Sequence, residues 1–139
     1  MSSHSTNGFS HITQEDHVPP TARLNSKKEI FFLPGLLGYG TQQSAPFHSL
    51  MANTGHTLYP ISYVENGWKA GAVALEVALL VRDSIVRGKE PILLGVSLGG
   101  LIAATAVEIL AEAERAQLTV IAVDSPYGAE TLKAVPGAM

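Results

Sequence analysis

The chain has 139 residues, of which 46% are hydrophobic and 15% charged, and its formal net charge is −3 at pH 7. This length and composition predict one globular domain with a substantial core, and the slightly acidic balance argues against a nucleic-acid surface. The absence of cysteine excludes disulfides, thiol catalysis and zinc–thiolate sites. It also fits a reducing cytosol, so we expect a cytoplasmic location.

The N-terminal segment 1–28 is polar and shows no apolar period, so it predicts a flexible tail ahead of a domain over 29–139. It lacks the apolar core of a signal peptide. The longest largely apolar run, 72–81, is shorter than the roughly 20 residues of a membrane span and carries Glu76, so we expect no membrane span. Three histidines lie in the tail: His4, His11 and His17. Scattered histidines in such a segment are typically solvated, so we expect no metal site.

Beyond the tail, apolar runs alternate with segments of helical period. Strands are predicted over 29–33, 56–62, 91–96 and 118–124. Helices are predicted from Ser44 to just before Gly55, from about Trp68 to Arg87, and from Leu98 to Arg115. This alternation predicts an α/β fold with three layers, a parallel sheet with helices on both faces.

The second predicted helix carries its polar residues in one narrow stripe. The stripe consists of Lys69, Glu76, Asp83 and Arg87. Because most of its other residues are apolar, this helix is expected to be covered on most sides.

A serine stands where the third predicted strand meets the third predicted helix, in the pentapeptide Gly95-Val96-Ser97-Leu98-Gly99. This G-x-S-x-G pattern between strand and helix is typical of a nucleophile elbow, in which the serine takes a strained conformation. Larger side chains in place of either glycine would collide with the turn. Ser97 would project from the carboxyl edge of the sheet at a helix N-terminus, where the N–H of Leu98 is the natural first oxyanion donor.

Two other interpretations of this turn remain open: a simple tight turn in which the glycines only allow packing, and a nucleotide-binding loop. A dinucleotide-binding loop requires G-x-G-x-x-G, and Ser97 occupies the position of its middle glycine. A phosphate-binding P-loop requires a lysine after the last glycine, and none is present. We therefore rank the nucleophile elbow first, a simple tight turn second and a nucleotide site third.

A second glycine-rich loop, Pro34 to Gly40, follows the first predicted strand. In proteins with a nucleophile elbow, the second oxyanion donor comes from a loop after an earlier strand. Gly35 would allow close approach of the backbone. We therefore expect the N–H of Leu36 to be that donor.

The segments FLPGLLGYG, LLGVSLGGL and VIAVDSPYG, in this order, resemble the α/β-hydrolase superfamily, and most of all the thioesterase domains of polyketide and non-ribosomal peptide synthetases. The resemblance covers 29–132. It implies that Ser97 is the nucleophile, that Asp124 orients a histidine, and that Leu36 and Leu98 supply the oxyanion donors. It also implies a small-molecule acyl ester or thioester substrate, free or bound to a carrier protein, and no cofactor. An Asp before Ser-Pro also often caps a turn, which is the alternative for Asp124.

The chain departs from that family in its histidines. No histidine follows Ser97, and His48 and His56, which flank the first predicted helix, do not match the family's position. We therefore expect an α/β-hydrolase-like domain truncated after its fourth strand. It would be a serine hydrolase that is inactive unless a histidine completes it. The alternative is a non-catalytic module that binds an acyl group or a protein, with a homodimer covering the exposed sheet edge.

Overall fold

The computed structural model describes residues 4–5, 9, 11–15, 27–35, 43–44, 47, 56–63 and 69–123. The strands are β1 (His4–Ser5), β2 (Ile12–Glu15), β3 (Lys28–Leu33), β4 (Thr57–Tyr63), β5 (Glu90–Val96) and β6 (Thr119–Val123). The helices are α3 (Ala70–Val86), α4 (Leu98–Ile109) and α5 (Glu112–Arg115). No helix in these ranges is long and apolar enough to cross a membrane.

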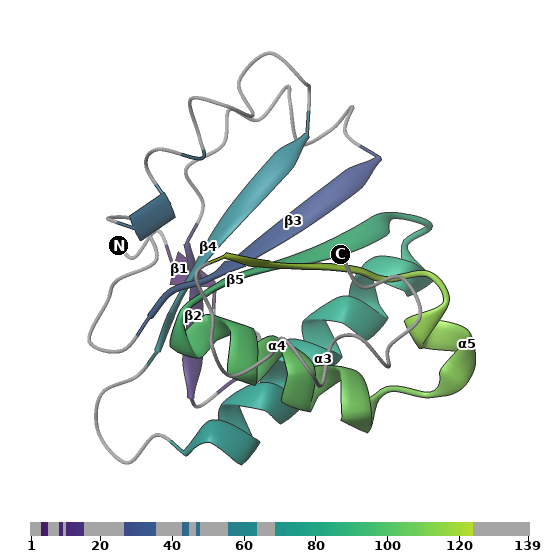
Figure 1. The fold of residues 1–139 in the computed structure, drawn as a ribbon. Coiled ribbons are helices and arrows are strands. Elements are labelled where there is room, and N and C mark those ends of the chain that lie inside the picture. The colour runs from purple at the N-terminus through teal and green to yellow at the C-terminus, as the bar shows by residue number, and fades with distance from the viewer. Residues whose placement is uncertain are drawn as a thin grey trace.

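The strands form one six-stranded sheet in the order β1-β2-β4-β3-β5-β6. The neighbours β4–β3, β3–β5 and β5–β6 are parallel, whereas β1–β2 and β2–β4 are antiparallel. Helices α3 and α4 lie on the same side of the sheet (Figure 1). The fold is therefore of the α/β class with a mostly parallel sheet, and the carboxyl ends of four parallel strands meet at one edge.

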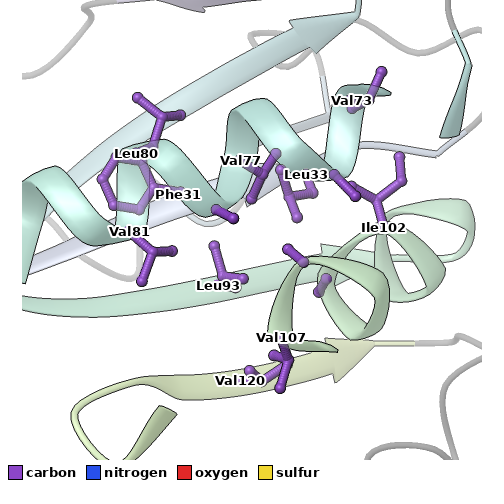
Figure 2. Packing of buried hydrophobic residues seen from close by; sticks show 14 of the residues in the cluster. Phe31, Leu33, Val73, Val77, Leu80, Val81, Leu93, Ile102, Val107 and Val120 are labelled. Carbon is purple, nitrogen blue, oxygen red and sulfur yellow. The ribbon is translucent and has the colours of Figure 1, made fainter. Parts of the chain in front are cut away.

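The strand β3 is buried on both faces, as its uninterrupted apolar run predicted. Phe31 and Leu33 belong to the main core, which also contains Val77 of α3 and Ile102 of α4 (Figure 2). Ile30 and Phe32 point to the opposite face and form a second cluster. The ring of Phe47, a helical residue, packs there on Phe32, with 5.4 Å between the ring centroids.

The expected flexible tail over 1–28 is wrong for the residues described here, because two of its segments form β1 and β2. Ile12 is completely buried in the main core. The carboxylate of Glu76 on α3 accepts hydrogen bonds from the backbone N–H groups of His11 (2.9 Å) and Ile12 (3.2 Å). It also contacts the ring Nδ1 of His11 at 2.5 Å. Glu76, one of the four residues of the polar stripe, is therefore buried against β2.

The other end of α3 is tied to the sheet by a second buried carboxylate. Arg87, just past the helix, donates two hydrogen bonds of 2.8 and 2.6 Å to Glu29 at the start of β3. Glu29 is 3% exposed, and its hydrogen bonds with the guanidinium raise the pKa of Arg87 above its ordinary value. Two acidic side chains thus link α3 and its C-cap residue to strands of the sheet.

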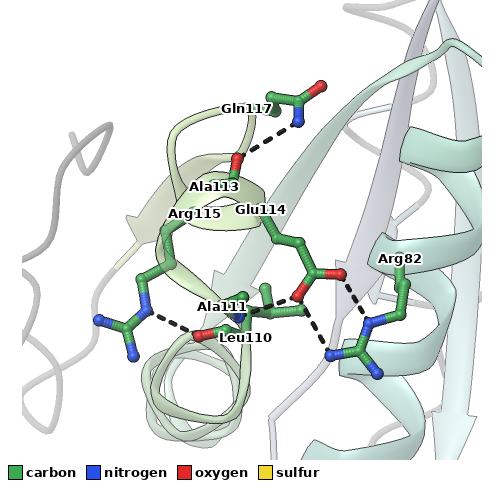
Figure 3. A network of polar contacts seen from close by, with 7 residues as sticks. All are labelled: Arg82, Leu110, Ala111, Ala113, Glu114, Arg115 and Gln117. Carbon is green, nitrogen blue, oxygen red and sulfur yellow. Dashed lines mark hydrogen bonds and ion pairs between the residues drawn. The ribbon is translucent and has the colours of Figure 1, made fainter.

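The helix predicted to run from Leu98 to Arg115 is instead broken at Leu110, whose backbone is extended (φ −74°, ψ 149°). The break is stabilised by polar contacts on both sides (Figure 3). Glu114 accepts the N–H of Ala111 at 2.9 Å, which starts α5. Arg115 donates to the carbonyl oxygens of Val107 and Leu110 at the end of α4, where regular helical pairing stops, and the carbonyl of Val107 also accepts the N–H of Leu110 at 3.2 Å. α5 then leads into β6.

Within the described residues, the four predicted strands and the predicted second helix match within a residue or two. Most of the first predicted helix lies outside the described residues. The predicted second strand becomes β4, and Pro60 lies just before the stretch that pairs with β2, so its missing N–H does not interrupt that pairing. Gln43 is already helical, so the first helix begins before Ser44. The predicted helix start at Trp68 lies outside the described residues.

Candidate functional site: the Ser97 turn

Ser97 lies alone between β5, which ends at Val96, and α4, which begins at Leu98. Its backbone has φ 54° and ψ −118°, and it is the only non-glycine residue in the described ranges with positive φ. Such a conformation costs on the order of 1–3 kcal/mol and persists only where the surroundings enforce it. The strained strand-to-helix turn predicted from the pentapeptide is present.

The glycines on either side of Ser97 permit close contact between backbones. A Cβ at Gly95 would lie 2.5 Å from the carbonyl oxygen of Gly99. A Cβ at Gly99 would lie 2.0 Å from the carbonyl oxygen of Leu33, at the end of β3. The predicted collisions are therefore real, but at Gly99 the obstacle is the neighbouring strand and not the serine turn. The absence of side chains at Gly95 and Gly99 therefore lets the first turn of α4 pack closely against the carboxyl edge of the sheet.

The first turn of α4 provides a donor beside Ser97. The N–H of Gly100 already donates to the carbonyl of Ser97 at 2.9 Å. The N–H of Leu98, as the first helical residue, has no acceptor within α4. Its position at a helix N-terminus favours negative charge, which suits an oxyanion donor.

The glycine-rich loop after β3 approaches the same turn. Gly35 is buried, and a Cβ built on it would lie 3.5 Å from the Cβ of Ser97 and 3.7 Å from the carbonyl oxygen of Val96. The N–H of Gly35 donates to Oε1 of Gln43 at 2.8 Å. Leu36, the expected second oxyanion donor, lies outside the described residues.

The end of β6 also reaches this turn. The N–H of Ser97 donates to the carbonyl oxygen of Val123 at 3.1 Å, and Val123 pairs with Val96 in the sheet register. Asp124, the expected acid, is the next residue in the chain and lies outside the described residues. The strand that precedes it is therefore hydrogen-bonded to the serine.

The histidines whose side chains are described lie away from Ser97. His56 precedes β4 at the amino edge of the parallel strands, whereas Ser97 follows β5 at the carboxyl edge. Seven residues of β5 separate the two edges by roughly 20 Å. His11 lies at the carboxyl edge, but two strands stand between β2 and β5, which puts it about 14 Å away across the sheet. His17 and His48 lie outside the described residues.

Sequence reasoning did not predict the contacts that Tyr63 and Gln43 make with the loop after β3. The O–H of Tyr63 donates to the carbonyl oxygen of Pro34 at 2.7 Å. Burial raises the pKa of Tyr63 well above its ordinary value, so the phenol stays neutral and remains a donor. The only available signal was the place of Tyr63 at the end of a strand whose carboxyl edge faces the site, and this signal does not specify a hydrogen-bond partner.

No group of three or more histidine and acidic side chains in the described part of the chain is arranged to hold a metal ion. A scan against protein-family models finds no matching family, and a search of curated proteins finds no matching sequence. The function is therefore inferred from the geometry of the Ser97 turn itself.

Proposed function

We propose that this chain carries the nucleophile and oxyanion site of a serine hydrolase that transfers acyl groups from an ester or thioester. The observation that carries the proposal is the backbone of Ser97, at φ 54° and ψ −118° between a buried parallel strand and a helix N-terminus. A tight turn with no chemical role could use glycine at this position without strain, whereas a serine held there presents its hydroxyl at the carboxyl edge.

In the proposed reaction, Oγ of Ser97 attacks the acyl carbonyl carbon and a base accepts the hydroxyl proton. The carbonyl oxygen becomes an oxyanion, which accepts hydrogen bonds from the N–H of Leu98 and from the loop that begins at Pro34. The bond to the alcohol or thiol then breaks, the leaving group takes the proton, and an acyl-enzyme remains. Water releases the acid and regenerates the serine.

Three features support assignment of this site to the α/β-hydrolase arrangement. Gly35 of the loop after β3 lies close to Ser97, β6 is hydrogen-bonded to Ser97 just before Asp124, and Leu98 begins the helix. In this proposal Asp124 orients the histidine and the N–H of Leu36 is the second oxyanion donor. Neither His11 nor His56 would be this histidine, because His56 lies at the opposite edge of the sheet and His11 is bonded to Glu76.

A second candidate function is a binding module that holds an acyl group or a protein without catalysis. The placement of His11 and His56 favours it, because Ser97 without a base is a poor nucleophile. This candidate keeps the strained turn and the glycine contacts and predicts no covalent chemistry at Ser97.

The test is intact mass after exposure to a fluorophosphonate probe, with Ser97→Ala as the variant and Ser84→Ala as its matched control. Ser84 is a fully buried serine on α3, so its replacement changes the same atoms far from the turn. The hydrolase proposal predicts one adduct on the wild-type chain and on Ser84→Ala, and none on Ser97→Ala. A folded wild-type chain that takes no adduct would favour the binding module.

A further inference from the structure

The Pro34–Gly35 peptide group is hydrogen-bonded at both of its ends. Its carbonyl oxygen accepts the O–H of Tyr63 at 2.7 Å. Its N–H donates to Oε1 of Gln43 at 2.8 Å. Because the carbonyl and the N–H belong to one planar peptide unit, Tyr63 of β4 and the helical residue Gln43 together fix the rotation of that plane.

This peptide group lies directly beside the serine. Pro34 and Gly35 are buried, and a Cβ on Gly35 would be in van der Waals contact with the Cβ of Ser97 at 3.5 Å. The next peptide N–H along the chain belongs to Leu36, the proposed second oxyanion donor. A glycine backbone is the least restricted of all residues, so the place of this peptide group beside Ser97 must be held by side chains from outside the loop.

We infer that Tyr63 and Gln43 are positioning residues that together hold the Pro34–Gly35 peptide group beside Ser97, at the start of the loop proposed to supply the second oxyanion donor. The inference rests on the proposed hydrolase function and adds two residues to it. The N–H of Gly35 is engaged by Gln43 and is therefore not the oxyanion donor itself.

The test compares Tyr63→Phe and Gln43→Leu with two matched controls in which the same atoms change elsewhere. Tyr59→Phe alters a tyrosine on the same strand whose O–H makes a longer 3.4 Å contact with Glu29. Gln117→Leu alters an exposed glutamine beyond α5. The rate of fluorophosphonate labelling of Ser97 should fall about tenfold in Tyr63→Phe and in Gln43→Leu, and should stay unchanged in both controls.

Two further readouts separate positioning from a general loosening of the fold. With p-nitrophenyl butyrate as the substrate, kcat should fall and KM should stay constant. The Gly35 amide should exchange its hydrogen faster in Gln43→Leu, and Gln43→Glu, which retains an acceptor oxygen, should restore slow exchange. Because both side chains hold one peptide group, the double variant should lose less than the product of the two single losses.

The outcomes distinguish this inference from the function on which it depends. A wild-type chain that takes no label at Ser97 overturns the proposed function and the positioning role with it. A labelled wild-type chain with unchanged rates in Tyr63→Phe and Gln43→Leu leaves the function intact and overturns the positioning role. Slower labelling accompanied by an equal effect of Tyr59→Phe or Gln117→Leu also overturns it.

Discussion

The Ser97 turn and the N-terminal strand pair β1–β2 are held in different ways. At the turn, backbone atoms of Gly95, Gly99 and Leu33 pack so closely that no side chain fits between them. The strand β2 pairs with β4 and buries Ile12, and one side chain, Glu76, ties its start to α3 from a position 65 residues away from His11 in the chain. The first region depends on the absence of side chains, whereas the second depends on side chains, the buried Ile12 and the carboxylate of Glu76.

The difference determines what each region tolerates. Backbone contact cannot relax around an added methyl group, because both partners belong to regular elements that are fixed elsewhere. A carboxylate that accepts two backbone N–H groups holds a strand firmly, but its loss affects only the edge of the sheet. A substitution that disrupts the turn should therefore destabilise the whole fold, whereas one that disrupts the strand pair should loosen only that edge of the sheet.

The largest effect is expected for Gly99→Ala, because its Cβ would lie 2.0 Å from the carbonyl oxygen of Leu33. The free energy of unfolding should fall by about 3 kcal/mol or more, as measured by urea denaturation. Gly71→Ala is the matched control, because a Cβ at Gly71 of α3 meets nothing within 4 Å. That control should gain about 0.5–1 kcal/mol. Equal effects at the two glycines would show that the backbone contact at the turn is not tight.

The next largest effect is expected for Glu76→Gln, which places an amide NH2 against backbone donors that need an acceptor. The loss should be about 2–3 kcal/mol, because buried N–H groups of His11 and Ile12 are left poorly paired. Hydrogen exchange should accelerate at the Ile12 amide more than at the Ser97 amide, since only the strand pair loses its anchor. Glu108→Gln, on an exposed position of α4, should change stability by less than about 0.5 kcal/mol. Uniform acceleration at both amides would contradict local failure.

A smaller effect tests the strain at the turn. With φ at 54°, Ser97→Gly should be more stable than Ser97→Ala by about 1 kcal/mol, because glycine adopts this conformation without cost. The pair Ser84→Gly and Ser84→Ala, in the interior of α3, should show the opposite order by about 1 kcal/mol. Thermal or urea unfolding of the four variants gives both differences. The same order at both sites would mean that the turn stores no strain.

The contrast also explains which parts of the molecule the sequence could predict. The strained turn was predictable because its requirements fall on adjacent positions, where glycine at 95 and 99 and a strand–helix boundary are all visible. The parallel strands were predictable from their continuous apolar runs. In each case the residues that determine the structure are adjacent in the sequence, and the structure requires residue types, glycine or a run of apolar residues, that are easily recognised there.

The strand β2 was not predictable in this way, because ITQE has one apolar residue and no visible alternation. Its stability comes from the burial of Ile12 and from Glu76, and neither residue signals the other in the sequence. The same holds for Tyr63 and Gln43, whose contacts with the loop depend on which strands become neighbours. The helix break at Leu110 was missed because the apolar period continues through it, and side-chain contacts from α5 decide the boundary.

The smallest effect is expected at Glu114, a carboxylate that also bridges distant elements but at the surface. Arg82 of α3 donates to it at 2.6 and 3.1 Å, and hydrogen bonds from Arg82 and from the N–H of Ala111 lower the pKa of Glu114 (Figure 3). A carboxylate with a lowered folded-state pKa adds stability above its unfolded pKa, and this contribution disappears as the pH falls through the folded value. Glu114→Gln should therefore lower the melting temperature by about 1–3 °C at pH 7, and this difference should vanish in strong acid. Calorimetry at both pH values, with the exposed Glu112→Gln as the control, measures it. A loss as large as that of Glu76→Gln would show that burial is not what separates the two carboxylates.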